Sequence, residues 1–170
     1  MLPIVLAPHA IRAGLAGAGE ALKRRRTLLS DAEIAEPDLY EGRLPTADEI
    51  SRLDILFVAG LDETTSRDLA ASARRAGVLV NVEDAPKLCD FHVPAQIRRG
   101  DLLFTISTGG RSPALARVLR ERVEASFGPE WEERLDELAT ARARWRSSGL
   151  DPQAVATQTR EFLEHKGWLA

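Results

Sequence analysis

The feature that most constrains the fold is a strand–helix–strand pattern in the first half of the chain. Residues 54–60 form a short apolar run, and residues 78–82 form a second run that is rich in valine. Between them, residues 62–76 have the apolar spacing of a helix, which Gly77 would end. Two buried strands joined by a helix run parallel, and their connection is right-handed. The pattern therefore predicts an α/β fold with a mostly parallel sheet over residues 1–84.

Shorter signals predict the rest of the chain. Before this pattern we expect two extended segments, a helix, a weak strand and a short helix, at residues 4–6, 11–16, 17–30, 33–36 and 46–52. After it we expect a strand and three helices, at residues 102–107, 113–127, 130–146 and 153–166. Ser112 suits the N-cap of the first of these helices, and Pro113 suits its first position. The part after residue 127 is thus predicted to be all-helical.

Composition and charge exclude several classes of protein. The chain has 170 residues and a net charge of −3, which argues against a general nucleic-acid binder. No apolar run approaches the roughly 20 residues needed to cross a bilayer, and the N-terminal segment lacks the basic region of a signal peptide. The single Cys89 excludes an internal disulfide framework, and with three histidines it leaves no spacing for a tight metal site. We therefore expect a cytoplasmic protein with no nucleic-acid or membrane partner and no bound metal.

A glycine-containing turn at residues 17–21 is the first candidate site. Gly17-Ala-Gly19 follows an extended segment and opens a helix, so its backbone could approach a pyrophosphate at the positive end of that helix. Nucleotide sites of this kind also need an acidic residue about 20 positions later for the ribose, and Glu36 lies 19 residues after Gly17. Leu22 stands where a third glycine or alanine is usual. The alternative is a small-residue turn that only lets a helix pack on a strand.

Two adjacent carboxylates, Glu83 and Asp84, form the second candidate site. They follow a buried strand at its carboxyl end, where open α/β sheets bind ligands. Burial and mutual repulsion of two such groups are typical of a general base. The alternative is an aspartate that caps a turn before Pro86, and spacing alone favours that alternative.

The segment Ile106–Pro113 is the third candidate site. It has two hydroxyl residues, two glycines and an arginine before a helix, and backbone N–H groups in such a turn can form an anion-binding concavity. Arg111, Arg117 and Arg120 add positive charge that suits a phosphate or a polycarboxylate. The alternative is an ordinary capped helix start, which needs neither two glycines nor an arginine.

Three further features favour structural roles. The basic run Lys23–Arg26 either faces cofactor phosphates or forms a solvated helix face, and the second is favoured. His92 is either a proton carrier or an exposed loop residue, and again the second is favoured. The tryptophans of the C-terminal part are expected to anchor hydrophobic contacts there: Trp131, Trp145 and Trp168.

Taken in order, these motifs resemble the sirohaem synthase family, whose members are NAD-dependent precorrin-2 dehydrogenases and in some cases also sirohydrochlorin ferrochelatases. The resemblance rests on stretches at residues 2–5, 17–21, 80–91, 94–95, 99–102 and 106–117. It spans about residues 2–125 and is most specific over residues 80–117. The helical C-terminal part matches only in general character.

The resemblance implies an architecture and a reaction. The architecture is a Rossmann-like NAD-binding domain at residues 1–92, a dimerisation segment at 93–127 and a small helical domain at 128–170, assembled as a homodimer. In the reaction, NAD⁺ takes hydride from the tetrapyrrole precorrin-2 to give sirohydrochlorin, and in bifunctional members Fe²⁺ then enters the ring. The alternative is a tetrapyrrole-binding protein or chelatase on the same scaffold with weakened or lost NAD chemistry. A third hypothesis is a nucleotide-sensing module.

The resemblance also implies roles for single residues. Asp84 falls on the family's key aspartate, and Thr108, with Ser107 beside it, falls on the active-site hydroxyl position. The residues expected at the cofactor are Gly17, Ala18, Gly19, Glu20, Ala21, Glu36 and Gly60. Those expected at the substrate are Asn81, His92, Gly109, Gly110, Arg111, Ser112 and Arg117. Ala18 interrupts the family's consecutive glycines, and Glu36 at the ribose would disfavour the 2′-phosphate of NADP.

Overall fold

The computed structural model describes residues 2–34 and 36–169. The chain divides into two structural units, Met1–Val93 and Pro94–Ala170. This division lies one residue from the predicted boundary between residues 92 and 93. The further boundary predicted between residues 127 and 128 stays a prediction.

The described part of the first unit contains a sheet of four strands: β1 (Ala13–Gly17), β2 (Asp38–Glu41), β3 (Ile55–Ala59) and β4 (Leu79–Val82). Their order is β2-β1-β3-β4, and every neighbouring pair is parallel. The predicted strands at residues 54–60 and 78–82 and the parallel sheet are therefore confirmed.

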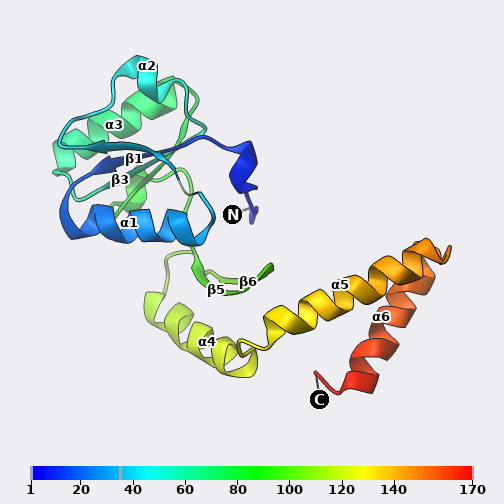
Figure 1. Ribbon diagram of the computed structural model, residues 1–170. Helices are drawn as coiled ribbons and strands as arrows, with labels where there is room; N and C mark the ends of the chain where they lie inside the picture. Colours follow the sequence, from blue (N-terminus) through cyan, green and yellow to red (C-terminus); the bar gives the residue numbers. More distant parts are fainter. Residues whose placement is uncertain (1, 35, 170) are drawn as a thin grey trace. The chain divides into compact units, whose positions relative to one another are not determined.

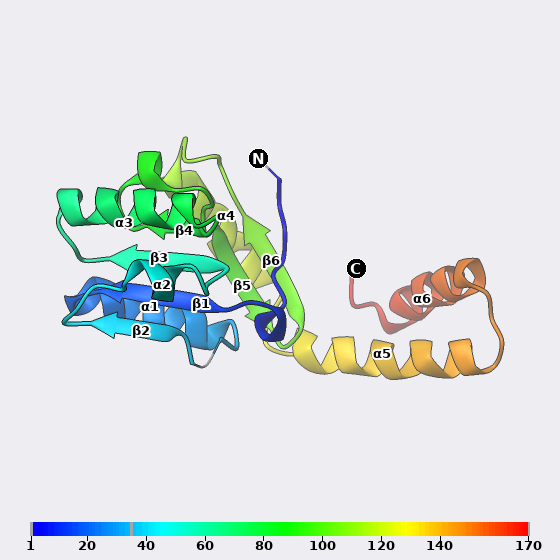
Figure 2. The ribbon, with the colours of Figure 1, turned by 90° about the horizontal axis from the view of Figure 1, so that it is seen from above.

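Helices cover both faces of this sheet, as Figures 1 and 2 show. Helix α1 (Gly19–Asp31) lies on one face, and α2 (Ala47–Ile50) and α3 (Glu63–Arg75) lie on the other. Side chains of β3 alternate between the two sides, because successive residues of a strand point to opposite faces. Ile55 and Phe57 pack in the core under α1, whereas Leu56 and Val58 pack in the core under α3.

Helix α3 begins and ends at the residues that the sequence indicates. The Asp62 carboxylate accepts a hydrogen bond from the backbone N–H of Thr65 at 2.9 Å, which caps the helix. A hydrogen bond from the Thr65 hydroxyl, and then this backbone bond, lower the pKa of Asp62. Gly77, with φ of +75°, ends the helix and leads into β4.

Two of the predicted elements in this unit are wrong. Residues 4–6 form no strand, and the single 3₁₀ turn near them is η1 (Pro8–Ala10). The weak strand predicted at 33–36 is replaced by the end of α1, where Glu33 has φ of +63° and the N–H of Ile34 donates to Leu29 O at 2.9 Å. Residue 35 lies outside the described residues. The second strand is instead β2, which starts at Asp38.

The second unit starts with an antiparallel hairpin of β5 (Ala95–Arg99) and β6 (Leu102–Ile106). Strand β6 confirms the strand predicted at 102–107, but β5 was not predicted, because glutamine and two arginines interrupt its apolar pattern. Three helices follow: α4 (Pro113–Ser126), α5 (Trp131–Ser147) and α6 (Pro152–Lys166). All three confirm the predicted helices.

Aromatic side chains pack α5 against α6 and against the residues that follow α6. Trp131 and Trp168 have ring centroids 6.3 Å apart, and Trp145 and Phe162 have centroids 6.0 Å apart. Arg134 lies over the Trp131 ring at 5.1 Å. The predicted anchoring role of the tryptophans is therefore confirmed. None of the helices in residues 2–34 and 36–169 has the length and apolar character to span a membrane.

Candidate functional site

The carboxyl ends of the parallel strands form the edge of the sheet where a ligand is expected. The chain leaves β1 toward β2 on one side and later returns to β3 on the other side, so a topological switch point lies between β1 and β3. Open α/β sheets bind ligands in the crevice at such a point. The loops that meet there are residues 17–19 after β1 and residues 60–62 after β3.

Gly17 and Gly60 let these two loops pack backbone against backbone. A Cβ atom on Gly17 would lie 2.0 Å from Ala59 O, and one on Gly60 would lie 2.3 Å from Ala18 O. The N–H of Ala18 donates to Ala59 O at 3.1 Å. Gly17 and Gly60 thus have a packing role, as the alternative of a small-residue turn implies. Any side chain at either position would push the two loops apart.

Gly19 is different because it faces open space. Its φ is +64°, and apart from its chain neighbours and the backbone of its own helix, no heavy atom of the described residues lies within 4 Å of the position its Cβ would take. Ala18 is the N-cap of α1, and no described side chain bonds to the first N–H groups of this helix. Uncapped N–H groups at the positive end of a 13-residue helix fit the pyrophosphate of a dinucleotide. Glu20, which would repel that anion, is paired with Lys23 at 2.6 Å.

The acidic residue at the end of the second strand is Glu41. The assignment of Glu36 to the ribose rested on a strand at 33–36 and is wrong, because Glu36 precedes β2 at the amino end of the sheet. Glu41 ends β2 and is the register partner of Gly17 on β1. Neighbouring strands lie about 4.8 Å apart. Glu41 therefore lies beside the glycine turn, as a ribose-binding acid must.

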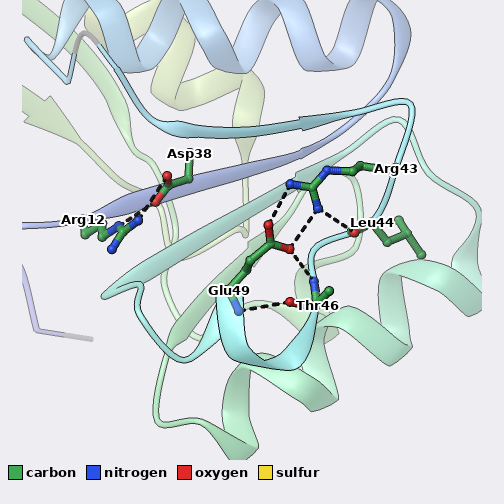
Figure 3. Close-up of polar contacts among 6 residues, drawn as sticks. All are labelled: Arg12, Asp38, Arg43, Leu44, Thr46 and Glu49. Atoms are coloured by element: carbon green, nitrogen blue, oxygen red, sulfur yellow. Dashed lines mark hydrogen bonds and ion pairs between the residues drawn. The ribbon is translucent and has the colours of Figure 1, made fainter.

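A network of polar contacts fixes the loop after β2, as Figure 3 shows. Arg43 donates two hydrogen bonds to Glu49, Nη2 to Oε1 at 2.7 Å and Nη1 to Oε2 at 2.9 Å. The N–H of Thr46 donates to Glu49 Oε2 at 2.8 Å, and the N–H of Glu49 donates to the Thr46 hydroxyl, which completes a capping box for α2. The hydrogen bonds from Arg43, and then those from Thr46, lower the pKa of Glu49 to about 2.

The amino end of β2 is fixed separately. Arg12 Nε donates to Asp38 Oδ2 at 2.6 Å (Figure 3). The Arg12 backbone N–H donates to Asp54 Oδ2 at 2.7 Å. The bond to Asp38 raises the pKa of Arg12. This pair lies at the edge opposite the glycine turn, so it aligns the strands and takes no part in the candidate site.

Asp84 follows β4 at the carboxyl edge of the sheet. It is exposed and has φ of +58°, a left-handed conformation that a residue other than glycine seldom adopts. Within residues 2–34 and 36–169 its carboxylate has no hydrogen bond or ion pair, and the N-cap of the following turn η2 (Pro86–Leu88) is Ala85. The capping alternative is therefore wrong, and Asp84 keeps a free carboxylate at the edge where ligands bind.

Glu83 has a different environment from Asp84. Its carboxylate lies 3.5 Å from Arg24 Nη2 and 3.8 Å from Arg25 Nε. Arg25 is only 18% exposed and lies over the Phe57 ring, so the predicted solvated face of the basic run is wrong for this residue. Glu83 thus ties α1 to the end of β4, and the two adjacent carboxylates do not act as a pair.

The segment after Asp84 folds back along the outer edge of β4. Asp90 donates its N–H to Val80 O at 2.8 Å, and Asn81 Nδ2 donates to Phe91 O at 2.9 Å. Asn81 is 4% exposed, and its Oδ1 has no hydrogen-bond partner among the described residues. The predicted contact of Asn81 with a substrate stays a prediction. His92 is exposed, as expected of a loop histidine.

The turn before α4 belongs to the second unit, and its own side chains satisfy most of its backbone. The Thr108 hydroxyl accepts from Ser112 N at 3.2 Å and donates to Ser112 O at 3.1 Å. Ser107 Oγ accepts from Gly109 N, and Thr108 O accepts from Arg111 N. Three N–H groups of the turn therefore already have partners within it, which limits the predicted anion-binding concavity. Ser112 Oγ caps α4, as predicted.

The arginines near this turn differ in whether an acidic side chain already pairs with them. Arg117 pairs with Glu121 at 3.4 Å, and Arg120 pairs with Glu124 at 2.6 Å. Arg111 is exposed, and among the residues that the structure describes its side chain has no acidic partner. Gly109 and Gly110 both have positive φ, at +63° and +77°, and shape the turn that presents Arg111. Over the same residues, no three histidine, cysteine or acidic side chains cluster as a metal site would require.

The first unit thus brings Gly17, Gly19, Gly60, Glu41 and Asp84 to one edge of the sheet, whereas Thr108 and Arg111 belong to the second unit. Sequence reasoning missed Glu41, Arg43 and Glu49. One signal was present, because Thr46-Ala-Asp-Glu49 matches the capping-box pattern.

Comparisons with known proteins show which family the chain resembles. A family model described as putative NAD(P)-binding matches residues 4–95, and one described as sirohaem biosynthesis protein central matches residues 99–126. A siroheme synthase of Methylococcus capsulatus is 33% identical over 90% of this chain and 36% of its own length, and one of Methylobacillus flagellatus is 33% identical over 87% and 35%. The solved structure of SirC, a precorrin-2 dehydrogenase, superposes with a TM-score of 0.72 at 19% identity, over the whole chain and 93% of its own length.

These matches confirm the resemblance seen in the motifs and the Rossmann-like fold of the first unit. The chain spans about a third of the length of the siroheme synthases it matches. The putative NAD(P)-binding model alone covers more than half of the chain. The chain therefore belongs to the putative NAD(P)-binding family and is a homologue of the siroheme synthases over the part of those proteins that it spans.

Proposed function

We propose that this chain is an NAD⁺-dependent dehydrogenase that converts precorrin-2 to sirohydrochlorin in sirohaem biosynthesis. The observation that carries the proposal is the free carboxylate of Asp84, in a left-handed turn at the same sheet edge as the open Gly19 turn. The relationship to siroheme synthases, and the fold shared with a precorrin-2 dehydrogenase, supply the substrate class.

The first unit would hold the dinucleotide. The uncapped N–H groups at the start of α1 bind the pyrophosphate, and Gly19 leaves room for it. Gly17 and Gly60 keep the two loops close enough to form one crevice, with Ala18, Glu20 and Ala21 around it. Glu41 accepts hydrogen bonds from the ribose hydroxyls. When bound, NAD⁺ supplies the hydride acceptor.

Asp84 would serve as the general base. Dehydrogenation removes a hydride and a proton from the substrate, so a group must take the proton as the hydride leaves. The Asp84 carboxylate is exposed and unpaired in the described structure, so it can accept that proton without first breaking an ion pair. Glu83 cannot replace it, because Arg24 and Arg25 hold its carboxylate.

The second unit would recognise the carboxylates of the tetrapyrrole. Arg111 is presented by a glycine turn and is free of acidic partners among the described residues, so it can form bidentate contacts with a carboxylate. Arg117 would first have to leave Glu121. Ser107 Oγ accepts one hydrogen bond, and its own O–H has no acceptor among the described residues, whereas the Thr108 hydroxyl both accepts and donates within the turn. Ser107 is thus the better candidate for a direct hydroxyl contact.

A homodimer is part of the proposal. Helix α4 lies within the segment that matches the sirohaem biosynthesis central family, and it exposes Leu115, Val118 and Leu119. Exposed apolar side chains on one helix are typical of an interface. Iron insertion is a second candidate activity with Fe²⁺ as substrate, because the same free Asp84 carboxylate could take the pyrrole protons that the metal displaces. We propose the cytoplasm as the location.

One spectroscopic experiment separates the candidates. The purified chain is mixed with precorrin-2 and NAD⁺, and NADH absorbance and tetrapyrrole spectra are followed together. A dehydrogenase forms NADH and sirohydrochlorin in equal amounts. Tetrapyrrole binding or iron insertion without NADH would support the chelatase alternative. Nucleotide binding without tetrapyrrole binding would support a sensing module and overturn the proposal.

A further inference from the structure

The end of β2 carries two signals that point to different cofactors. An acidic residue at this position binds the ribose 2′-hydroxyl of NAD, whereas a nearby arginine accommodates the 2′-phosphate of NADP. Glu41 is the acid, and Arg43 follows it by two residues at the same edge. The sequence therefore does not decide between the two nucleotides, and the contacts of Arg43 do.

Arg43 is held by Glu49 in a bidentate pair, with N–O distances of 2.7 and 2.9 Å (Figure 3). Nη1 also donates to Leu44 O at 3.3 Å, and the guanidinium lies over the Tyr40 ring at 5.0 Å from its centroid. The guanidinium thus has a carboxylate, a carbonyl and an aromatic face as partners at once. A 2′-phosphate would have to displace this whole set before Arg43 could bind it.

Glu49 is itself fixed in the position that captures Arg43. Its Oε2 accepts from the N–H of Thr46 at 2.8 Å, and the Thr46 hydroxyl accepts from the N–H of Glu49. The pKa of Glu49, lowered to about 2, keeps the carboxylate charged throughout the physiological range. A carboxylate that is oriented by a helix cap and permanently ionised competes with a phosphate for the same guanidinium.

We propose that Glu49 is a cofactor-specificity residue that keeps Arg43 from the 2′-phosphate of NADP, so that the site selects NAD. This inference rests on the proposed function, because it presupposes that the first unit binds a pyridine dinucleotide. Glu49 acts through Arg43 and need not touch the cofactor. While Arg43 is paired with Glu49, the exposed carboxylate of Glu41 is the charge that faces the ribose. This negative charge repels a 2′-phosphate.

The test measures binding of NAD⁺ and of NADP⁺ by titration calorimetry, in the absence of tetrapyrrole. The variant is Glu49→Gln, which keeps the oxygen that accepts from Thr46 but loses the charge that holds Arg43. We expect wild type to prefer NAD⁺, and the ratio of NADP⁺ to NAD⁺ affinity to rise about tenfold in the variant, as one new charge-assisted contact would give. The double variant Arg43→Ala/Glu49→Gln is the matched control and should lose the gain.

The possible failures are distinguishable. If wild type binds NAD⁺ preferentially but Glu49→Gln leaves the ratio within twofold, the specificity role of Glu49 is overturned and the proposed function stands. A gain that persists in the double variant also overturns it, because Arg43 would then not be the group released. If wild type binds neither nucleotide, both proposals fall. Glu49→Ala serves in the same comparison if circular dichroism shows that the glutamine variant is unfolded.

Discussion

The sulfur of Cys89 bonds to both backbone polar groups of Val82. Sγ accepts from Val82 N at 3.2 Å and donates to Val82 O at 3.2 Å, and it also lies 3.5 Å from Ala85 O. The thiol thereby closes the chain across residues 82–89 and supports the turn that holds Asp84 in its left-handed conformation.

This contact predicts the behaviour of variants at Cys89. In Cys89→Ala the N–H of Val82 loses its partner, and we expect amide hydrogen exchange at Val82 to accelerate by about tenfold, which corresponds to a local loss of roughly 1–1.5 kcal/mol. Cys89→Ser keeps a donor and an acceptor and should lose less. Exchange measured by NMR checks this, and unchanged protection of Val82 in the alanine variant would refute the supporting role of the thiol.

Alanine substitutions at Gly60 and Gly19 should have different effects, the first mainly on stability and the second mainly on NAD⁺ binding. Gly60→Ala places a Cβ 2.3 Å from Ala18 O at a positive φ, so we expect the unfolding free energy of the first unit to fall by about 2–4 kcal/mol. Gly19→Ala has open space around it and should cost only about 1 kcal/mol, but its methyl group should weaken NAD⁺ binding at least tenfold. Thermal unfolding and calorimetry measure both effects. Equal stability losses in the two variants would contradict the distinction.

Glu49 predicts a defined pH dependence. Its pKa is lower in the folded protein, at about 2, than the ordinary value of 4.5. The pair with Arg43 therefore contributes its full stability above about pH 5, and this contribution is lost as the pH falls through the folded pKa. The difference in melting temperature between wild type and Glu49→Gln should be constant from pH 7 to about pH 5 and shrink toward pH 2. A difference that instead grew on acidification would have the wrong sign.

The arginines of the second unit predict an order of effects on substrate binding. Arg111→Ala should weaken tetrapyrrole binding about tenfold or more, because this arginine is free to meet a carboxylate. Arg117→Ala should have a smaller effect, since Arg117 already pairs with Glu121. Absorbance titrations with sirohydrochlorin measure both, with Arg122→Ala on the same helix as the control. If Arg111→Ala weakened NAD⁺ binding more than tetrapyrrole binding, the turn would hold the other ligand.

The sequence predicts the apolar strands of this fold better than the polar ones. Strands β3 and β4 and helix α3 were predicted because both strands are mostly apolar and Asp62 and Gly77 mark the helix ends. Strand β2 was misplaced because it is a four-residue edge strand with an acid at each end, whereas the more apolar Ile34 belongs to the end of α1. Strand β5 was missed because Gln96, Arg98 and Arg99 hide its alternation.

The candidate site was predicted where its signal is local. The glycine turn and Asp84 follow from spacing and from strand ends, which one stretch of sequence contains. The pairing of Glu41 with Gly17 and of Arg43 with Glu49 depends on strand register and on the fold of the 42–46 loop, which no local pattern gives. The hydrogen bonds within the turn before α4, in which the N–H groups of Gly109, Arg111 and Ser112 already have partners, also depend on the folded turn and not on a local pattern.

The most direct test of the central claim is the turnover of Asp84→Asn. Precorrin-2 and NAD⁺ are supplied to wild type, to Asp84→Asn and to Asp68→Asn, an exposed aspartate of α3 that serves as the control. If Asp84 takes the proton, its asparagine variant should bind NAD⁺ normally but form NADH at least about 100-fold more slowly, while the control matches wild type. NADH formation by Asp84→Asn within twofold of the wild-type rate would contradict the account.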